Sequence, residues 1–475
     1  MASSVSFNDL DPSCLKQIFS FLRGDDCARL ACTAPLWRDA AGASDLWEGF
    51  IQQEYHQEAG KLAEVSDACS STETCRETYQ KLHLLRWRAR KMWKKLEGWC
   101  TENATQISES LQAGATEAQI QEVERELDVT FPEAFKQIYR VHNGQLLNYD
   151  QCLDDDNNGS VVRPDGSIFA GLFGGYSFYN HFVCTRMLPL KRMVKWTKWM
   201  RESDRMRERG SGEKRDPDEH HYVLFAASYV FNKAFFLDTR DASVHAWTVD
   251  RIHFMRAIPE QRASGVLDGI LRWMEVYADR LQDGTYQMTA LLDDGEDTTA
   301  QQMDPSRGIC LFPVTEPGLA TAVTRGVQVR TSSLFAPELS MVSTTGNATF
   351  TLAYSVEFSL LQQDQEGTDE ALDRVKLRSR HWSVLDGSGK EFSTVNGAAV
   401  VGKYPDLVSG EGVFRYQSCS RQANKRGYME GSFIFTDISG CDSPISHSQE
   451  PGGNTENDFT VVCPRFHTNV PDVIF

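Results

Sequence analysis

Three short segments carry residues whose spacing could bind a metal ion or a phosphate. The first alternates Asp154, Asp156 and Asn158 before Gly159, as does the first half of an EF-hand calcium loop. The twelfth position holds Asp165 in place of the bidentate glutamate, and the Val-Val pair inside the loop favours a strand over a second helix. We therefore interpret this segment as a solvated acidic loop and predict no metal site there.

The other two segments are a glycine-flanked turn and a histidine pair. Residues 397–402 read Gly-Ala-Ala-Val-Val-Gly, which is close to a phosphate-binding glycine loop. Ala399 stands where a middle glycine would let the backbone approach a phosphate, and no helix pattern follows, so a strand and a turn are the better interpretation. His220 and His221 have no cysteine or carboxylate at ligand spacing, so we expect them to be solvated.

Nucleophiles and hydrolytic motifs give no candidate for catalysis. The sequence has no Gly-x-Ser-x-Gly, no Walker A and no His-Glu-x-x-His motif. Its 12 cysteines include no Cys-x-x-Cys pair and are scattered singly, which is typical of reduced thiols in a cytosolic or nuclear protein. We therefore predict no catalytic residue, no cofactor and no enzymatic activity.

A basic segment with interleaved aromatic residues, 84–95, could contact nucleic acid. The alternative is an amphipathic helix over Tyr79–Trp99 that packs between domains and exposes a basic face. We favour the helix because apolar residues recur at helical spacing, and because a net charge of -17 opposes binding to a phosphate backbone. The predicted buried face is Leu85, Ala89, Met92, Leu96 and Trp99.

Chain length and hydropathy set the scale of the fold. A chain of 475 residues with 41% hydrophobic content is too long for one ordinary core, so we expect two to four domains. The N-terminus lacks the basic and apolar regions of a secretory signal. The longest apolar run, 222–231, is far shorter than the roughly 20 residues that span a bilayer. We therefore expect a soluble protein of the cytoplasm, the nucleus or both, with no membrane and no nucleic-acid partner.

The periodicity of apolar residues changes twice along the chain. Residues 1–60 read as three short helices, the first with a stripe from Leu15 to Leu22. A mixed α/β region follows, with a capping-box helix from Thr116 and a mobile charged loop at 202–221. An acidic linker at 293–305 precedes a region of alternating strands and turns. That last pattern suits an antiparallel sandwich.

Particular residues resemble known domains. The N-terminal residues are similar to an F-box, a helical surface that offers apolar side chains to a Skp-type adaptor. Residues from Ile120 to Gly144 resemble the opening of a SUKH (Smi1/Knr4-like) domain. Ser379–Trp382, 396–402 and 431–433 are similar to the ApaG domain. The F-box resemblance rests on Leu10, Pro12, Leu15, Ile18, Phe19, Leu22, Arg29, Trp37, Leu46 and Trp47.

The three resemblances occur in the order found in F-box proteins of the plant Skp-interacting kind that carry an ApaG domain. They imply a multidomain α+β chain: a small helical F-box, a mixed α/β domain and an all-β immunoglobulin/fibronectin-like sandwich. The predicted boundaries are 1–60 for the F-box, 61–98 for a helical linker, 99–283 for the SUKH domain, 284–317 for an acidic linker and 318–475 for the ApaG domain.

The resemblance implies a substrate-recognition subunit of a Skp–cullin–F-box ubiquitin ligase. It would bind the Skp adaptor, and through it cullin, and would capture an unidentified target protein. The predicted adaptor-binding residues are Leu10, Pro12, Leu15, Ile18, Phe19, Leu22 and Trp47. For the target we predict Arg421, Arg426 and Tyr428, in an expected exposed loop at 418–431, because arginine and tyrosine dominate interface hot spots. The alternative is a ligand- or nucleotide-sensing binding protein with a vestigial F-box.

Overall fold

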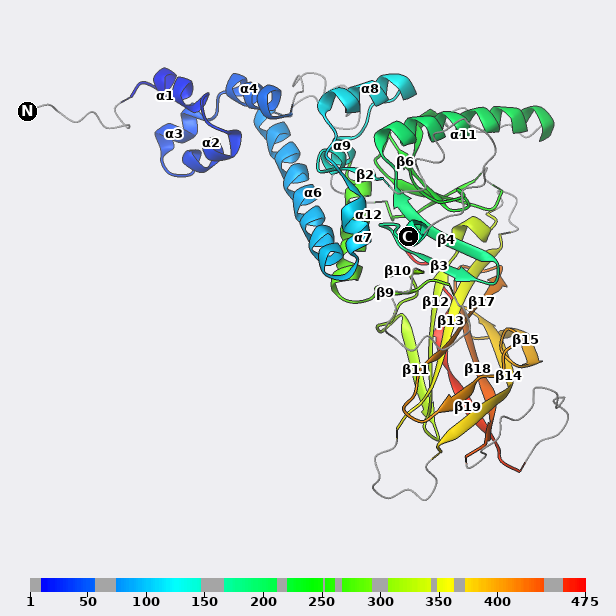
Figure 1. Ribbon diagram of the computed structural model, residues 1–475. Helices are drawn as coiled ribbons and strands as arrows, with labels where there is room; N and C mark the ends of the chain where they lie inside the picture. The colour runs from blue at the N-terminus through cyan, green and yellow to red at the C-terminus, as the bar shows by residue number, and fades with distance from the viewer. Residues whose placement is uncertain are drawn as a thin grey trace, which may run out of the picture.

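The N-terminal part of the chain forms a small helical module (Figure 1). The computed structural model describes residues 10–55, 74–146, 166–211, 220–250, 253–260, 267–292, 306–342, 348–362, 372–439 and 456–475, with the backbone alone at 203–211. The module contains α1 (Pro12–Phe19), α2 (Gly24–Ala31), α3 (Pro35–Ala40) and α4 (Ser44–Tyr55). Asp11 caps α1 by accepting a 2.7 Å bond from the Ser13 amide, and Pro12 suits the first helical turn. The sequence predicts three helices here; α3, of six residues, is too short to show a period.

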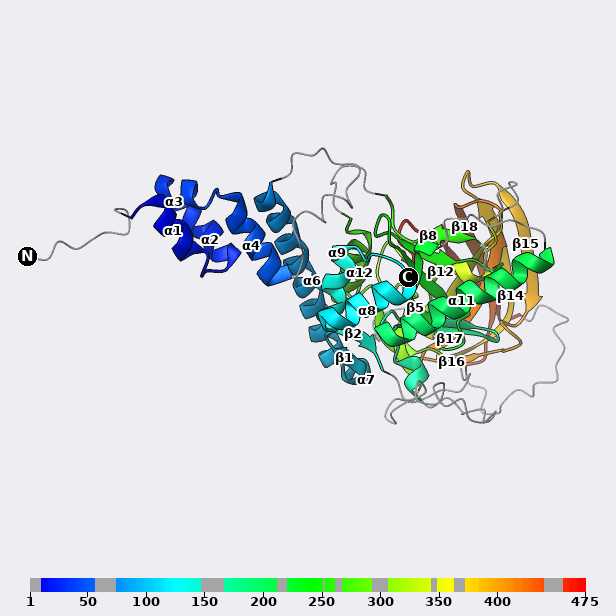
Figure 2. The same cartoon turned by 90° about the horizontal axis from the view of Figure 1, so that it is seen from above.

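One long helix, α6 (Cys75–Asn103), connects this module to the rest of the molecule. Thr74 and Glu77 form a capping box at its start. Tyr79 and Leu82 belong to the core of the helical module, whereas Leu85 and the buried residues that follow it belong to the next core. The predicted apolar face is confirmed, since all five of its residues are buried. Seen from above, the module stands away from the body at the end of α6 (Figure 2).

The middle region is an eight-stranded, mostly antiparallel sheet with helices packed on it. Its strand order is β8-β7-β6-β5-β4-β3-β10-β9, and only β3 and β10 run parallel. The strands are β3 (Gly175–Phe178), β4 (His181–Met187), β5 (Tyr222–Ser228), β6 (Ala234–Asp238), β7 (Val244–Trp247), β8 (Phe254–Arg256), β9 (Gln287–Ala290) and β10 (Arg307–Cys310). A separate small sheet pairs β1 (Leu111–Ala113) with β2 (His142–Gln145). The helices are α7 (Thr105–Ser110), α8 (Glu117–Leu127), α9 (Glu133–Tyr139), η2 (Gly166–Phe169), α11 (Leu190–Ser211) and α12 (Gly269–Gln282).

The C-terminal region is the predicted all-β sandwich. One sheet has the order β11-β12-β13-β17; the other has β15-β14-β18-β19, with β16 also paired to β14. The elements are β11 (Leu319–Thr324), β12 (Val327–Phe335), η4 (Pro337–Leu339), β13 (Phe350–Leu360), β14 (Arg374–Asp386), β15 (Glu391–Ala398), β16 (Asp406–Val408), β17 (Phe414–Gln422), β18 (Gly427–Asp437) and β19 (Asp458–His467). Inward side chains such as Val356, Trp382 and Phe433 fill the space between the sheets.

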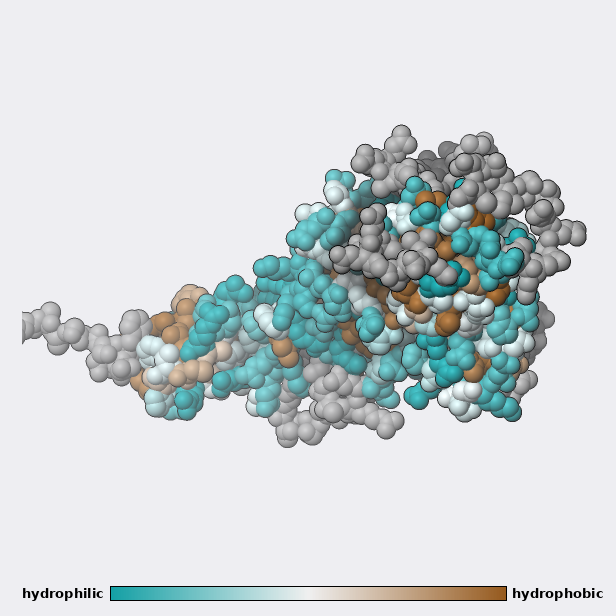
Figure 3. All heavy atoms as spheres, turned by 90° about the horizontal axis from the view of Figure 1, so that it is seen from below, coloured by the Kyte–Doolittle hydropathy of each residue, from teal (hydrophilic) through white to brown (hydrophobic). Residues whose placement is uncertain are grey.

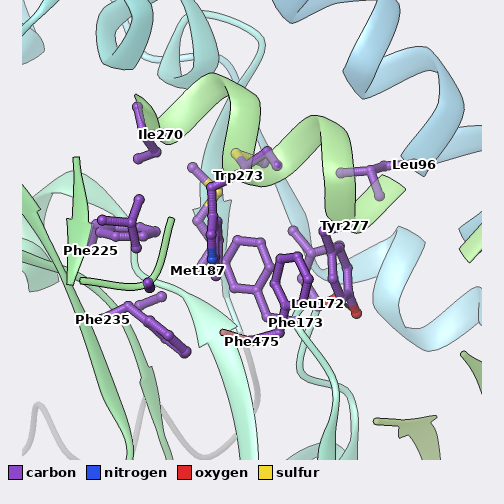
Figure 4. Close-up of a cluster of buried hydrophobic side chains, with 14 of the residues drawn as sticks. Leu96, Leu172, Phe173, Met187, Phe225, Phe235, Ile270, Trp273, Tyr277 and Phe475 are labelled. Atoms are coloured by element: carbon purple, nitrogen blue, oxygen red, sulfur yellow. Dashed lines mark hydrogen bonds between the residues drawn. The ribbon is translucent and has the colours of Figure 1, made fainter. Parts of the chain in front are cut away.

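The sandwich and the middle region share a core at their junction. Phe335 and Phe350 of the sandwich belong to the same buried cluster as the middle sheet. The tail after β19 turns back into that cluster, where Phe475 packs 5.1 Å from the ring of Trp273 and 5.1 Å from that of Tyr277 (Figure 4). The last segment of the sequence is therefore a structural part of the middle region.

Two sequence expectations for the middle region differ from the structure, and two others fall outside the described residues. The charged stretch predicted as a loop at 202–221 continues α11 as far as Ser211, because its long charged side chains are good helix formers. The predicted linker at 284–317 contains β9 and β10, whose mutual pairing closes one end of the middle sheet. The acidic stretch 293–305 and the acidic loop of Asp154–Gly159 lie outside the described residues.

Candidate partner-binding surfaces

Three of the predicted adaptor-binding residues lie inside the helical module. Leu15, Phe19 and Trp47 are buried, and the indole nitrogen of Trp47 donates a 2.5 Å hydrogen bond to the carbonyl of Ala41. A module of this size must bury its largest apolar groups to fold. In this state these three side chains are not available to a partner, and they position the helices instead.

The remaining predicted residues are partly or fully accessible. Pro12 is exposed, Ile18 is 37% exposed, and Leu10 and Leu22 pack only partly against the module core. Phe21, at 84%, is more exposed than Ile18, Leu10 or Leu22. Hydrophobic residues gather on this module in the space-filling view (Figure 3). Phe21 was missed because it follows the last turn of α1, although its position three residues after Ile18 was a usable signal.

The segment predicted to be a target-binding loop is a tight connection between the two sheets of the sandwich, since β17 pairs with β13 and β18 pairs with β14 and β19. Arg421 lies at the end of β17 and Tyr428 at the start of β18, so only a short turn containing Arg426 connects them. Arg421 and Arg426 are exposed, and Tyr428 is half-buried beside the ring of His467. The three predicted residues thus lie at one connection between the sheets, with Arg421 and Tyr428 on strands and Arg426 in the turn.

Other aromatic and basic residues of the sandwich have structural roles. Trp382 and Tyr416 are both buried between the sheets. The guanidinium of Arg380 donates to the carbonyl oxygens of Ala398 and Ala399, and His381 bonds to the Asn396 side chain. These contacts hold β15 and the turn after it against β14.

A buried polar cluster lies where the middle sheet meets the sandwich. Glu338 of η4 accepts a 2.6 Å bond from the Tyr176 hydroxyl and lies 2.9 Å from His181 Nε2. Burial acts to raise the pKa of the Glu338 carboxyl, but the charge of Lys233 and the hydrogen bond with His181 outweigh it, so the pKa is lowered. Burial lowers the pKa of Lys233 to about 8, against the opposing charge of Glu338. The Lys233 ammonium also bonds to the backbone oxygen of Phe475, so the cluster joins three distant segments.

Beside this cluster is a cavity of about 340 Å³ at the junction of the two regions. Its lining includes Tyr176, Arg280, Tyr286, Phe335 and Phe475. The Arg280 guanidinium donates a 2.6 Å bond to the Tyr286 hydroxyl and lies 5.0 Å from the centre of the Phe475 ring. The guanidinium of Arg280 therefore already makes structural contacts with Tyr286 and Phe475.

The described residues offer little for metal or thiol chemistry. Within them, no group of three His, Cys, Asp or Glu side chains is arranged to hold a metal ion. His220 is exposed, as predicted. Burial raises the pKa of the Cys184 thiol to about 12, which keeps it in the poorly nucleophilic protonated form. No helix in the described part of the chain has the length and apolar content to cross a membrane.

Comparisons with known proteins agree with this architecture. The SMI1/KNR4 family (SUKH-1) matches residues 114–260, and the ApaG domain family matches residues 341–437. The chain belongs to the family of F-box proteins that combine these two domains. This membership is shown by the F-box protein SKIP16 of Arabidopsis thaliana, which is 30% identical over 485 residues, spanning 99% of this chain and 100% of that protein.

The sandwich by itself has bacterial relatives. Protein ApaG of Methylobacterium nodulans is 33% identical over 150 residues, which is 32% of this chain and 92% of that protein. Protein ApaG of Methylorubrum extorquens is 36% identical over 119 residues, which is 25% of this chain and 81% of that protein. These relatives match the C-terminal region only.

Proposed function

We propose that this chain is the non-catalytic substrate-recognition subunit of a Skp–cullin–F-box ubiquitin ligase. In this proposal Ile18 and Phe21 bind a Skp-type adaptor, which connects the chain to cullin. The SUKH and ApaG regions capture a target protein, in the cytoplasm or the nucleus. Family membership supports the adaptor role, because F-box proteins are in general adaptors without catalytic activity of their own.

The observation that carries the proposal is an apolar surface on a module that one helix holds in place. Phe21 and Ile18 are exposed although such side chains each gain roughly 1.5–3 kcal/mol when fully buried. A partner that covers them would recover that free energy. Because α6 contributes to both the module core and the middle core, a partner bound at the module is held at a defined position relative to the target surfaces.

The test replaces Ile18 or Phe21 with aspartate in the full chain and measures co-purification with a Skp-type adaptor. Burying an unpaired carboxylate in the interface is costly. We therefore expect each variant to recover at least tenfold less adaptor than the native chain does. The matched control is Val462→Asp, which makes the same kind of change at an exposed position of β19. Native-level adaptor recovery by both variants, with unchanged circular dichroism, would contradict the proposal.

The alternative is a ligand-sensing binding protein, which the cavity beside Arg280 favours. In that case ATP, ADP or a similar anionic metabolite should raise the melting temperature of the full chain, and Arg280→Ala should abolish the shift. Adaptor recovery would then be weak for the native chain. The two proposals therefore predict different results for the ligand-induced melting-temperature shift and for adaptor recovery.

For target capture, the residues Arg421, Arg426 and Tyr428 of the β17–β18 connection remain our proposed contacts. Arg421 and Arg426 are exposed cations, and the Tyr428 ring lies 5.8 Å from the Arg465 guanidinium. An arginine–aromatic group of this kind offers both buried area and directed hydrogen bonds.

A further inference from the structure

We infer that the edge strand β15 of the sandwich binds an extended, acidic segment of the target, which adds to the sheet as a further strand. The inference rests on the proposed function, which supplies the target. It names the conformation and the charge of the segment that is recognised. Figure 1 shows β15 at the outer side of the sandwich, beside β14.

One side of β15 has no strand partner among the described residues. Its other side pairs with β14, from Ser379 opposite Ala398 to Leu385 opposite Glu391. Edge strands are usually protected by lysine, proline or short length, because their unpaired N–H and C=O groups can bind another extended chain. The eight residues of β15 contain no lysine and no proline, and Glu391 is their one charged residue.

Apolar side chains are exposed along the same edge. Val395 lies opposite Trp382 and therefore on the same face of the sheet, yet Trp382 is buried while Val395 is 43% exposed. The facing sheet therefore does not cover β15. The register shift between Val384 and Leu385 makes Phe392 the extra residue of a bulge, where its side chain is 51% exposed. The regular edge is thus Ser393–Ala398, with Phe392 beside it as an aromatic anchor.

The turn that follows β15 is conformationally strained. Ala399 has a φ of 63° and Val401 a φ of 49°, in the left-handed region that β-branched residues rarely adopt. Two backbone hydrogen bonds between Val400 and Lys403, of 3.0 and 2.9 Å, close the turn, and Arg380 holds its start. Strained backbone of this kind is concentrated at binding sites.

Three cations lie near the ends of this edge, although Glu391 and Asp386 are also there and the chain as a whole carries a net charge of -17. Lys390 precedes β15, and Arg378 lies at its far end, where its carbonyl accepts a 3.1 Å bond from the Ala399 amide. Arg426 lies against the turn at Gly387, so the β17–β18 connection proposed for target capture borders the same edge. An acidic segment complements these charges. A second copy of the chain, in contrast, would bring like charges together at the edge.

The experiment uses the full chain and a synthetic ten-residue peptide: six alternating valine and threonine residues with two glutamates at each end. Hydrogen exchange of residues 391–398, followed by mass spectrometry, should slow at least fivefold at saturating peptide. A peptide with lysines in place of the glutamates should slow it less than twofold at the same concentration. N-methylation of alternate amides on one edge of the acidic peptide should abolish protection, while methylation of the other alternate set should preserve it, because a strand pairs through one edge only.

Two full-chain variants complete the test. Val395→Asp should remove most of the protection, whereas Val249→Asp, at a similarly exposed position of the middle region, should leave it unchanged. The inference is overturned if the acidic peptide gives no protection at 391–398, if the acidic and lysine peptides protect equally, or if both methylated sets protect as well as the unmodified peptide. Protection that grows with protein concentration in the absence of peptide would indicate pairing between two copies and would also overturn it. Because adaptor recovery does not enter these readouts, this test and the adaptor test can fail separately.

Discussion

The indole nitrogen of Trp273 donates a 2.7 Å hydrogen bond to the backbone oxygen of Ile474, 201 residues further along the chain. Ile474 in turn donates its own amide to the carbonyl of Ala257 at 2.9 Å. Both partners belong to the middle region, although Ile474 follows the sandwich in sequence. The tail therefore couples the stability of the two regions.

This coupling predicts a large effect of Phe475→Ala. The side chain is buried against Trp273 and Tyr277, and Phe→Ala in a core typically costs about 3–5 kcal/mol. We expect the free energy of unfolding in urea to fall by roughly 3 kcal/mol. Val462→Ala, which truncates an exposed side chain, is the control and should change it by less than about 0.5 kcal/mol. Equal effects of the two substitutions would show that the tail does not stabilise the junction.

The same coupling bears on the isolated sandwich. The strand pattern predicts that a fragment from Gly318 to Phe475 folds alone as an all-β unit. The shared core predicts a β-rich but less stable fragment, because its Phe335, Phe350 and Phe475 would lose their partners in the middle region. Urea midpoints of the fragment and of the full chain, each followed by circular dichroism, make the comparison.

A break in α6 should uncouple the helical module from the body. Leu84 is exposed and lies between Leu82, in the module core, and Leu85, in the middle core. Leu84→Pro removes a helical hydrogen bond and should cost about 3 kcal/mol or more. Small-angle scattering should then show a wider distribution of intramolecular distances. Leu84→Ala, which keeps the helix, should leave the free energy of unfolding and the distance distribution near native. An unchanged distance distribution for the proline variant would show that α6 does not fix the position of the module.

The buried imidazole of His245 predicts a stability change in acid. Burial lowers its pKa to about 4, although the carboxylate of Asp238 opposes the shift, and Nε2 lies 2.8 Å from Ser243 Oγ. Since the unfolded side chain titrates near pH 6.5, the unfolded state binds the extra proton between pH 6.5 and 4. The stabilisation of the folded state by the neutral His245 side chain is therefore fully present above pH 6.5 and is lost as the pH falls through 4. From the size of the shift we expect a loss of about 3 kcal/mol over this range.

Urea unfolding at several pH values checks this expectation. His245→Gln should remove most of the slope between pH 6.5 and 4, because the substituted side chain does not titrate. The control is His253→Gln, at a more exposed histidine paired with Asp250. This variant should retain the slope of the free energy of unfolding between pH 6.5 and 4. A slope that is unchanged in the His245 variant would assign the acid sensitivity to other groups.

Replacement of Arg421, Arg426 and Tyr428 by alanine tests the β17–β18 connection as a target surface. The two arginines are exposed, so we expect each to change the free energy of unfolding by no more than about 0.5 kcal/mol, with Tyr428 costing somewhat more. Adaptor recovery should stay at the native level, whereas proximity labelling in cells should lose the partners that depend on the β17–β18 connection. An identical set of labelled partners for the variant and the native chain would exclude this surface.

Local patterns in the sequence were sufficient to predict helices or strands in each region, whereas the domains were identified by their resemblance to known families. The capping box at Thr116, the apolar face of α6 from Leu85 to Trp99, and the alternation around Val327 and Phe433 depend on neighbours a few residues away. Such periodicities follow from backbone geometry, so they are readable without an alignment. They also allowed the turn at 397–402 to be distinguished from a phosphate loop, although its strained φ angles were not predictable.

The tertiary structure determines which apolar and charged side chains stay exposed to a binding partner. Helical spacing placed Leu15, Ile18 and Phe19 on one stripe, but packing of the four-helix module buried the first and third and left Ile18 and Phe21 exposed. The position of Phe475 in a core formed by Trp273, and the lack of a strand partner on one side of β15, depend on contacts between residues far apart in sequence. The free energy of such contacts comes from shape complementarity between distant segments, which no local pattern encodes.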